Sequence, residues 1–282
     1  MLLSTFQTAS PVTRNRAFHG TNFSPSSLDM PFASIGRLAA VLTLSLAASS
    51  AVGAEPAIVA KARAYLGSES ALNGVKSVHY VGTMEAPNAA DPAKPTLVNI
   101  DIVFQAPYSQ RTVRSTPTLV DTTALDDYDS WHRVHDPKDP SRWNLQVLPA
   151  TQIKRQRAIV WENLAFFRGI EREGGKLLDQ GRVTLGGVAC RKLAFVHDTD
   201  VVFIRYFDES SGRLVLTETE GGSSIREQGE IMAGGIRFPK MILNSLKGPD
   251  GKEQMVTITF DRITVNEVLP QSAFAMPTFS GK

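Results

Sequence analysis

The segment MVTITFDRITV, residues 255–265, alternates apolar and polar side chains almost without interruption. Successive side chains of a β-strand point to opposite faces of the sheet, so this alternation predicts a strand with one apolar and one polar face. Val256, Ile258 and Phe260 share the apolar face. The fold must shield that face from water, either with a packed core or with a ligand held in a hollow.

The same period of two recurs through most of the chain. A first predicted strand carries apolar residues at alternate positions from Val78 to Met84, and a second does so from Val98 to Phe104. Further strands are predicted at residues 111–116, 118–125, 131–135, 143–148, 182–185, 188–196, 201–208, 214–220, 223–232, 236–246 and 253–265. Roughly a dozen mostly antiparallel strands cannot form one flat sheet. We therefore expect a mainly β fold with helices, built on a strongly curved sheet or partial barrel.

Helical spacing replaces this pattern near the start. Ile58, Ala62 and Leu66 recur on one helical face, and Gly67 stands where a helix C-cap is favoured. A helix ending near Gly67 is therefore expected, followed by a short helical turn at residues 70–73.

Helical spacing returns in residues 150–170, which contain neither glycine nor proline before Gly169. Their apolar residues fall on one stripe, which predicts a single amphipathic helix between two runs of strands. Phe166 and Phe167 cannot point in the same direction, so one of them should contact something that Trp161 does not. The different directions of the two phenylalanines are explained equally well by a helix that packs between a sheet on one side and a loop on the other.

Residues 30–54 have the layout of a secretory signal peptide. Arg37 precedes an apolar run, and small residues end the segment at Ala54. The run is shorter than the roughly 20 residues of a membrane-spanning helix. We expect translation to start at Met30 and cleavage to follow Ala54, so that residues 1–54 are an N-terminal extension and signal peptide.

The mature chain, residues 55–282, is expected to form a single domain in the periplasm. Position 55 is glutamate, whereas a lipid anchor requires a cysteine after the signal. The only cysteine, Cys190, lies in an apolar run and is predicted to be a buried strand thiol. All but three of the 30 basic and all but one of the 28 acidic residues follow residue 54, and this balance argues against nucleic-acid binding.

The sequence offers little catalytic chemistry. His132 and His135 are three residues apart on a predicted strand, so they point to opposite faces and suit a metal poorly. His79 and His197 are expected to be solvated. A nucleophile elbow, a phosphate-binding glycine loop and a zinc-binding helix motif are all absent from the sequence. We therefore expect a protein that is not an enzyme and that needs no metal or cofactor.

Four segments together suggest a family. They are LNGVKSVHYVGTM (72–84), APYSQRTVRS (106–115), LDDYDSWHRVHDP (125–137), and an ending in which IRFPKMIL precedes VTITFDRITVNEVLPQSAFAMP. In this combination the chain resembles the outer-membrane lipoprotein-sorting (LolA/LolB-like) superfamily over nearly all of residues 55–282. Without a lipid-anchor cysteine, it is most similar to the periplasmic carriers of that superfamily.

The resemblance implies an unclosed antiparallel barrel of roughly 11–12 strands, with an apolar hollow that receives acyl chains under a helical lid. The residues that it assigns to the hollow and the lid are Tyr80, Val98, Ile100, Ile102, Phe104, Trp161, Leu164, Phe167, Val256, Ile258 and Phe260. Arg111 stands where the carriers place an arginine that helps to hold the lid closed. The carriers have an aromatic residue just before this arginine, and this chain has Gln110 there.

Two functions follow as hypotheses. The first is a monomeric periplasmic carrier that moves lipid or lipoprotein acyl chains toward the outer membrane, between membrane-bound donor and acceptor proteins. The second is a sensor or scaffold with the same barrel that binds a protein segment, because superfamily members differ in function.

Overall fold

The computed structural model describes residues 55–88, 94–247 and 251–278. The predicted extension and signal peptide, residues 1–54, lie outside the described residues. Within the described ranges, no helix is both long enough and apolar enough to cross a membrane.

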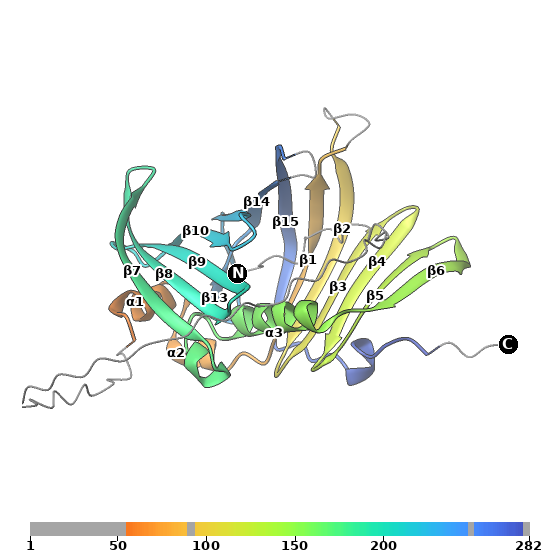
Figure 1. Cartoon of the computed structure of the whole chain (residues 1–282), viewed down its shortest axis with the longest axis horizontal. Helices are drawn as coiled ribbons and strands as arrows, with labels where there is room; N and C mark the ends of the chain where they lie inside the picture. The colour runs from red at the N-terminus through yellow and green to blue at the C-terminus, as the bar shows by residue number, and fades with distance from the viewer. Residues whose placement is uncertain (1–54, 89–93, 248–250, 279–282) are drawn as a thin grey trace, which may run out of the picture. The chain divides into compact units, whose positions relative to one another are not determined.

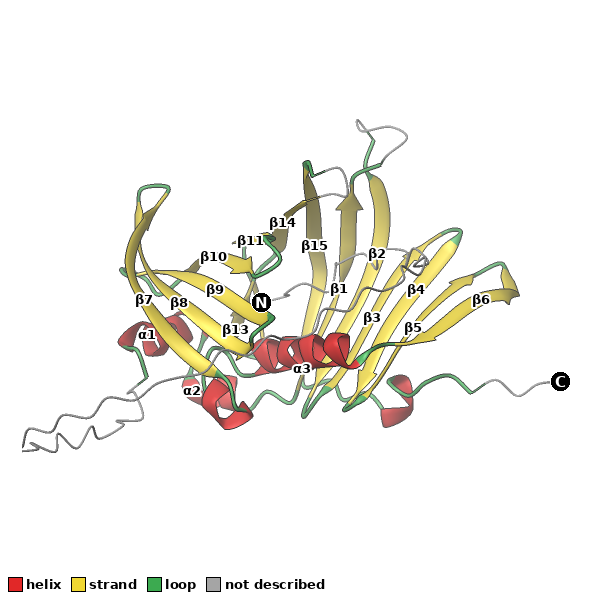
Figure 2. Cartoon of the chain, in the orientation of Figure 1, coloured by secondary structure: helices red, strands yellow, loops and turns green. Residues whose placement is uncertain are grey.

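Strands dominate the structure, and few helices accompany them (Figure 2). The helices are α1 (Ala57–Leu66), α2 (Glu69–Asn73) and α3 (Ala150–Leu164), with 3-10 turns η1 (Ile170–Glu173) and η2 (Gln271–Ala273). The strands are β1 (Ser77–Ala86), β2 (Thr96–Gln105), β3 (Ser109–Thr116), β4 (Leu119–Asp126), β5 (Asp129–Asp136), β6 (Asp139–Val147), β7 (Lys176–Leu185), β8 (Val188–Asp198), β9 (Val201–Asp208), β10 (Leu214–Thr219), β11 (Ser224–Gln228), β12 (Ile231–Ala233), β13 (Ile236–Phe238), β14 (Met241–Lys247) and β15 (Glu253–Val265).

Among the described residues, thirteen strands form one antiparallel sheet in the order β6-β5-β4-β3-β2-β1-β15-β14-β11-β10-β9-β8-β7. The sheet curves but does not close, since β6 and β7 remain its two ends (Figure 1). The predicted fold class is confirmed, although the sheet has more strands than expected. Two predicted strands are each split in two, at Gly229, which has a φ of 62°, and near Pro239, which cannot donate a ladder hydrogen bond.

The predicted helix over residues 150–170 is too long. Helix α3 ends at Leu164, because Phe166 and Phe167 adopt the left-handed backbone conformation, with φ of 49° and 74°. Such φ values are incompatible with an α-helix and uncommon for residues other than glycine. We call residues 165–169, which turn the chain away from α3 toward η1, the elbow.

The apolar face of β15 has packed protein against it. Val256, Ile258 and Phe260 are at most 8% exposed and belong to one buried cluster that includes Ile159 and Val160 of α3. Helix α3 contacts β1, β2, β3, β4 and β9, and so crosses the concave face of the sheet (Figure 1). In this state the hollow is filled by the protein's own helix.

The convex face has a separate cover. The Trp131 indole donates a hydrogen bond of 2.9 Å to the carbonyl of Phe274, which is fully buried beside the outer side of β5.

Cys190 is also fully buried, in a small cluster with Tyr206 and Leu216. The predicted burial of this thiol is confirmed, and burial raises its pKa.

The centre of the sheet depends on one glycine. At Gly82 the register between β1 and β15 shifts, and a Cβ added there would lie 2.1 Å from the Thr259 carbonyl oxygen. We expect Gly82→Ala to lower the free energy of unfolding by about 1–3 kcal/mol, because backbone must move to admit the methyl group. Urea denaturation measures this loss. A Gly82→Ala protein as stable as wild type would show that β15 yields at this point without cost.

Candidate functional site

The predicted lining residues lie together on the concave face. Nine of them are at most 9% exposed and belong to the main buried cluster: Tyr80, Val98, Ile100, Ile102, Phe104, Phe167, Val256, Ile258 and Phe260. Trp161 and Leu164 of α3 are half-buried and pack against the same cluster. Whether this surface receives a ligand stays a prediction, but its residues do form one continuous apolar face.

Arg111 lies elsewhere. It pairs across β2–β3 with Val103, whereas the concave face of β2 carries Ile102 and Phe104. Directly opposed residues share a face of the sheet, so Arg111 is on the convex side. There its guanidinium lies 3.3 Å from a carboxylate oxygen of Asp101. The structure therefore does not bring this arginine to the helix that it was expected to hold.

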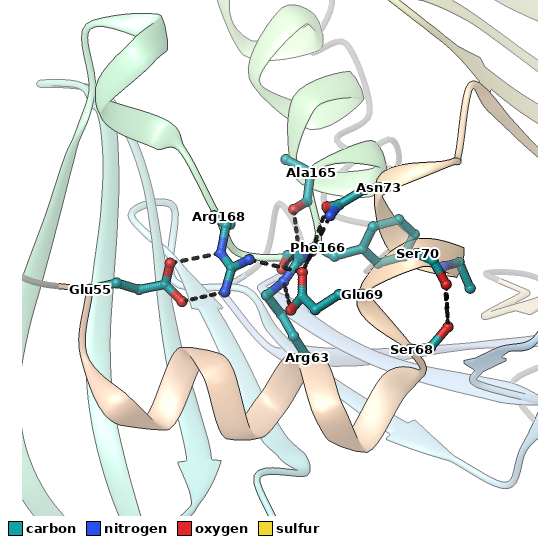
Figure 3. Close-up of polar contacts among 10 residues, drawn as sticks. Glu55, Arg63, Ser68, Glu69, Ser70, Asn73, Ala165, Phe166 and Arg168 are labelled. Atoms are coloured by element: carbon teal, nitrogen blue, oxygen red, sulfur yellow. Dashed lines mark hydrogen bonds and ion pairs between the residues drawn. The ribbon is translucent and has the colours of Figure 1, made fainter.

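The arginine that holds the end of α3 is Arg63 of α1, which is 1% exposed (Figure 3). Its Nη1 donates to the carbonyls of Ala165 and Phe166, at 3.0 Å and 2.9 Å. Its other donors bind the carboxylate of Glu69 at 2.9 Å and 2.8 Å, and Oδ1 of Asn73 at 2.8 Å. Arg63 thus satisfies backbone acceptors that the elbow leaves without helical partners.

A second arginine, Arg168, belongs to the elbow itself and adds contacts on its exposed side. Arg168 donates from Nε and Nη2 to Glu55, at 2.7 Å and 3.0 Å, and from Nη1 to Glu69 at 2.8 Å (Figure 3). Its side chain is 38% exposed, so water competes for these contacts. The elbow is therefore bound by one buried and one exposed arginine, which share Glu69.

A buried ion pair fixes the C-terminal turn of α3 to strand β9. Nη1 of Arg205 on β9 lies 2.6 Å from Oε2 of Glu162, and both side chains are fully buried. Nε2 of His197 on β8 lies 2.6 Å from the other carboxylate oxygen. The Arg205 guanidinium also lies over the ring of Phe195, 4.5 Å from its centroid. Burial alone would raise the pKa of Glu162, but the Arg205 charge and the His197 contact lower it.

The histidines expected to be solvated are not. His197 continues the inward series of Leu193 and Phe195 at alternate positions of β8, and its side chain is 10% exposed. His79 is 7% exposed on the convex face, between Glu267 at 2.9 Å and Asp101 at 3.1 Å, and the hydrogen bond with Asp101 raises its pKa. The alternation of β1 directs His79 to the convex face, and the alternation of β8 directs His197 to the concave face.

Three further cations tie the exposed side of α3 to both halves of the sheet. Lys154 binds Asp198 at 2.5 Å, and Arg155 reaches the Asp200 carbonyl at 2.9 Å. On the other side Arg157 stacks on Tyr108, 3.6 Å from the ring centroid. The first half of the helix is therefore attached on one side to the β8–β9 turn and on the other to the β2–β3 turn.

Acid should loosen the elbow. The hydrogen bond from Arg63 lowers the pKa of Glu69 from 4.5 to about 2. A lowered pKa contributes stability that is present above the unfolded value and lost as pH falls through the folded value. We expect the free energy of unfolding to fall between about pH 4.5 and 2, and to fall less in Glu69→Gln. Denaturation at several pH values measures this, and equal slopes for the two proteins would contradict it.

A pocket of about 470 Å³ opens beside the elbow. It lies between α1, the start of β10, the turn from β11 to β12, and the end of β13, and Phe167 forms part of its wall. Its volume is within the range of about 300–1,000 Å³ that is usual for small-molecule sites. The described residues contain no group of three or more side chains arranged to hold a metal ion.

Comparison with known proteins gives a fold. No family model matches the sequence, and no curated protein matches it. A solved structure of a LolA superfamily protein from Nitrosomonas europaea superposes with a TM-score of 0.51 at 14% identity, over 78% of this chain and 96% of that one. This chain has a LolA-like fold. The resemblance seen in the sequence is thus supported by the architecture.

Two other solved structures are similar over the same extent. A DUF1329 family protein from Desulfovibrio piger has a TM-score of 0.49 at 8% identity, with 78% of this chain and 96% of that chain covered. An outer membrane lipoprotein-sorting protein domain from Vibrio parahaemolyticus has a TM-score of 0.48 at 10% identity, with 77% and 94% covered. At identities this low, the function of this chain must be argued from its own site.

Proposed function

We propose that this protein binds lipids or the acyl chains of lipoproteins on its concave face and carries them through the periplasm toward the outer membrane. One observation carries the proposal: the inner face of an unclosed sheet is apolar along its centre, and α3 covers it. The fold shared with the LolA superfamily protein from Nitrosomonas europaea is consistent with this role.

Binding requires α3 to give way. Ile159 and Val160 lie against the sheet, while the attachments at the elbow are ion pairs and hydrogen bonds that water can replace. Burying an alkyl chain is favourable by about 0.8 kcal/mol for each CH₂ group, so ten groups supply about 8 kcal/mol. Moving the helix consumes part of this gain. Transfer stays reversible if the two terms are close in size.

The elbow is the natural hinge for this movement. Phe166 and Phe167 occupy a strained backbone region, which costs of order 1–3 kcal/mol for each residue and persists only where its surroundings enforce it. Arg63 holds the backbone in this conformation through its hydrogen bonds to the Ala165 and Phe166 carbonyls. Release of Arg63 would therefore let the elbow relax, and α3 would leave the sheet once the Glu162–Arg205 ion pair also opens.

A pair of matched variants tests the proposal. Phe260 and Phe274 are both fully buried, but on opposite faces of the sheet. We expect either alanine substitution to cost about 3–5 kcal/mol of stability. Only Phe260→Ala should also weaken binding of a fluorescent fatty acid, by about tenfold or more, since it removes apolar contact from the binding face. Fluorescence titration of proteins shown by circular dichroism to be folded makes this comparison.

Two outcomes would count against the carrier. Equal effects of the two substitutions on probe binding would place the probe elsewhere, and a wild-type protein that binds no probe would remove the proposal. The second result would favour a sensor or scaffold that binds a protein segment. A specific feature fits that alternative: β6 and β7 end the sheet, and Val147 on β6 is 68% exposed, so an added strand could pair there.

A further inference from the structure

The pocket beside the elbow has an apolar wall. Phe167 and Phe238 are 2% exposed and Leu214 is 8% exposed, and all three border this space. Ala62 and Leu66 of α1 complete the same wall. An alkyl chain placed here would contact side chains that already belong to the main buried cluster.

The rim of the pocket is charged. Nη1 of Arg237 donates to Glu230 at 2.9 Å, and the Tyr65 hydroxyl donates to the same carboxylate oxygen at 2.9 Å. The Glu230 carboxylate therefore accepts two hydrogen bonds. Nε of Arg237, in contrast, is buried without a hydrogen-bond partner among the described residues. Glu227 also borders the pocket and is engaged in an interaction of its own.

Arg213 adds a second cation to the rim. Its side chain is exposed, and within the described ranges its guanidinium forms no hydrogen bond and no ion pair. The rim thus has guanidinium N–H groups without partners in the described part of the chain, those of the exposed Arg213 and the buried Nε–H of Arg237, while Glu227 and Glu230 already have partners. Guanidinium groups bind carboxylate, sulfate and phosphate by paired hydrogen bonds.

We propose that this pocket binds a single-chain anionic amphiphile, with its alkyl chain against Phe167, Leu214 and Phe238 and its anionic head between Arg213 and Arg237. This inference rests on the proposed function and deepens it, because it names a point of access and a class of ligand. A carboxylate, sulfate or phosphate head meets the same donors.

Phe167 connects the pocket to the concave face. Its ring lies 5.0 Å from that of Phe207 and 6.2 Å from that of Phe195, both inside the main cluster, while its other side borders the pocket. It belongs to the elbow and has the larger positive φ of the two phenylalanines. A chain that displaces this ring passes from the pocket into the cluster beneath α3.

The test compares head groups and arginines. Laurate and dodecyltrimethylammonium, which have similar tails and opposite charges, are titrated into the full chain below their micelle concentrations by calorimetry. We expect laurate to bind at least about tenfold more tightly, and Arg213→Glu to weaken laurate binding by about tenfold, which corresponds to about 1.4 kcal/mol. The control is Arg226→Glu, an exposed arginine of β11 outside the pocket with the same change in charge, which should bind laurate as wild type does.

The outcomes separate the inference from the function on which it rests. Equal affinity for the two amphiphiles, or equal losses in Arg213→Glu and Arg226→Glu, would overturn the anionic pocket and leave the carrier standing. Binding of neither amphiphile would overturn both. Circular dichroism verifies that each variant remains folded, as is expected because both arginines are exposed.

Discussion

Replacing Glu162 with leucine should destabilise the protein by about 3–5 kcal/mol, because it leaves the Arg205 charge buried without its counter-ion. Both side chains are fully buried, and their charged atoms are 2.6 Å apart. The aromatic rings around Arg205 soften this loss but cannot replace a carboxylate. Urea denaturation followed by circular dichroism measures the change.

The double variant Glu162→Leu/Arg205→Met is the control. Replacing both members of a buried ion pair with apolar side chains of similar size is often neutral or stabilising, so most of the lost stability should return. His197 then loses its carboxylate partner and keeps its edge contact with Trp161, at 5.3 Å between ring centroids. A double variant as unstable as Glu162→Leu alone would show that the charges are not coupled in this way.

Arg63→Met should have the second large effect, a loss of about 2–5 kcal/mol, because the buried Phe166 carbonyl loses its donor and the Ala165 carbonyl keeps only the backbone N–H of Arg168, at 3.3 Å. It should also accelerate association of a fluorescent fatty acid, since α3 is then released more often. Arg168→Met is the matched control. It removes an exposed arginine from the same elbow and should cost no more than about 1 kcal/mol.

Stopped-flow mixing of these variants with the probe separates stability from access. Suppose that the Arg63→Met protein is destabilised but binds the probe at the wild-type rate. The elbow would then not control access to the concave face. Equal acceleration in Arg63→Met and Arg168→Met would mean that general loosening, rather than the buried contact with Ala165 and Phe166, sets the rate.

The alternation of apolar and polar residues predicted the sheet well, because the two faces of each strand lie in different environments. Residues 201–208 and 253–265 form strands with the predicted bounds, and Gly67 caps α1, its N–H bonding to Arg63. The elbow could not be predicted this way. Nothing in the local sequence favours a left-handed conformation at Phe166 and Phe167, and it is held by Arg63, about a hundred positions earlier.

The polar residues of the site were missed for a related reason. Arg205 lies at alternate positions with Phe203 and Phe207, so the period of two does place it inside the sheet. A charged residue in such a series predicts a buried partner. Identifying Glu162 as that partner needs the packing of α3 on β9, which local pattern does not contain. Arg111 was misplaced because the resemblance identified it from the residues next to it in the sequence. The face of β3 on which its side chain lies was not considered.

Photolabelling tests the central claim most directly. A fatty acid with a diazirine near its methyl end is bound to the protein and irradiated, and the adducts are mapped by mass spectrometry. Acyl chains on the concave face should label peptides from β1, β2 and β15, which carry Tyr80, Ile100 and Phe260, and excess unlabelled laurate should suppress these adducts. Adducts confined to the convex face, around Trp131 and Phe274, or adducts that laurate does not suppress, would contradict a carrier whose cargo lies beneath α3.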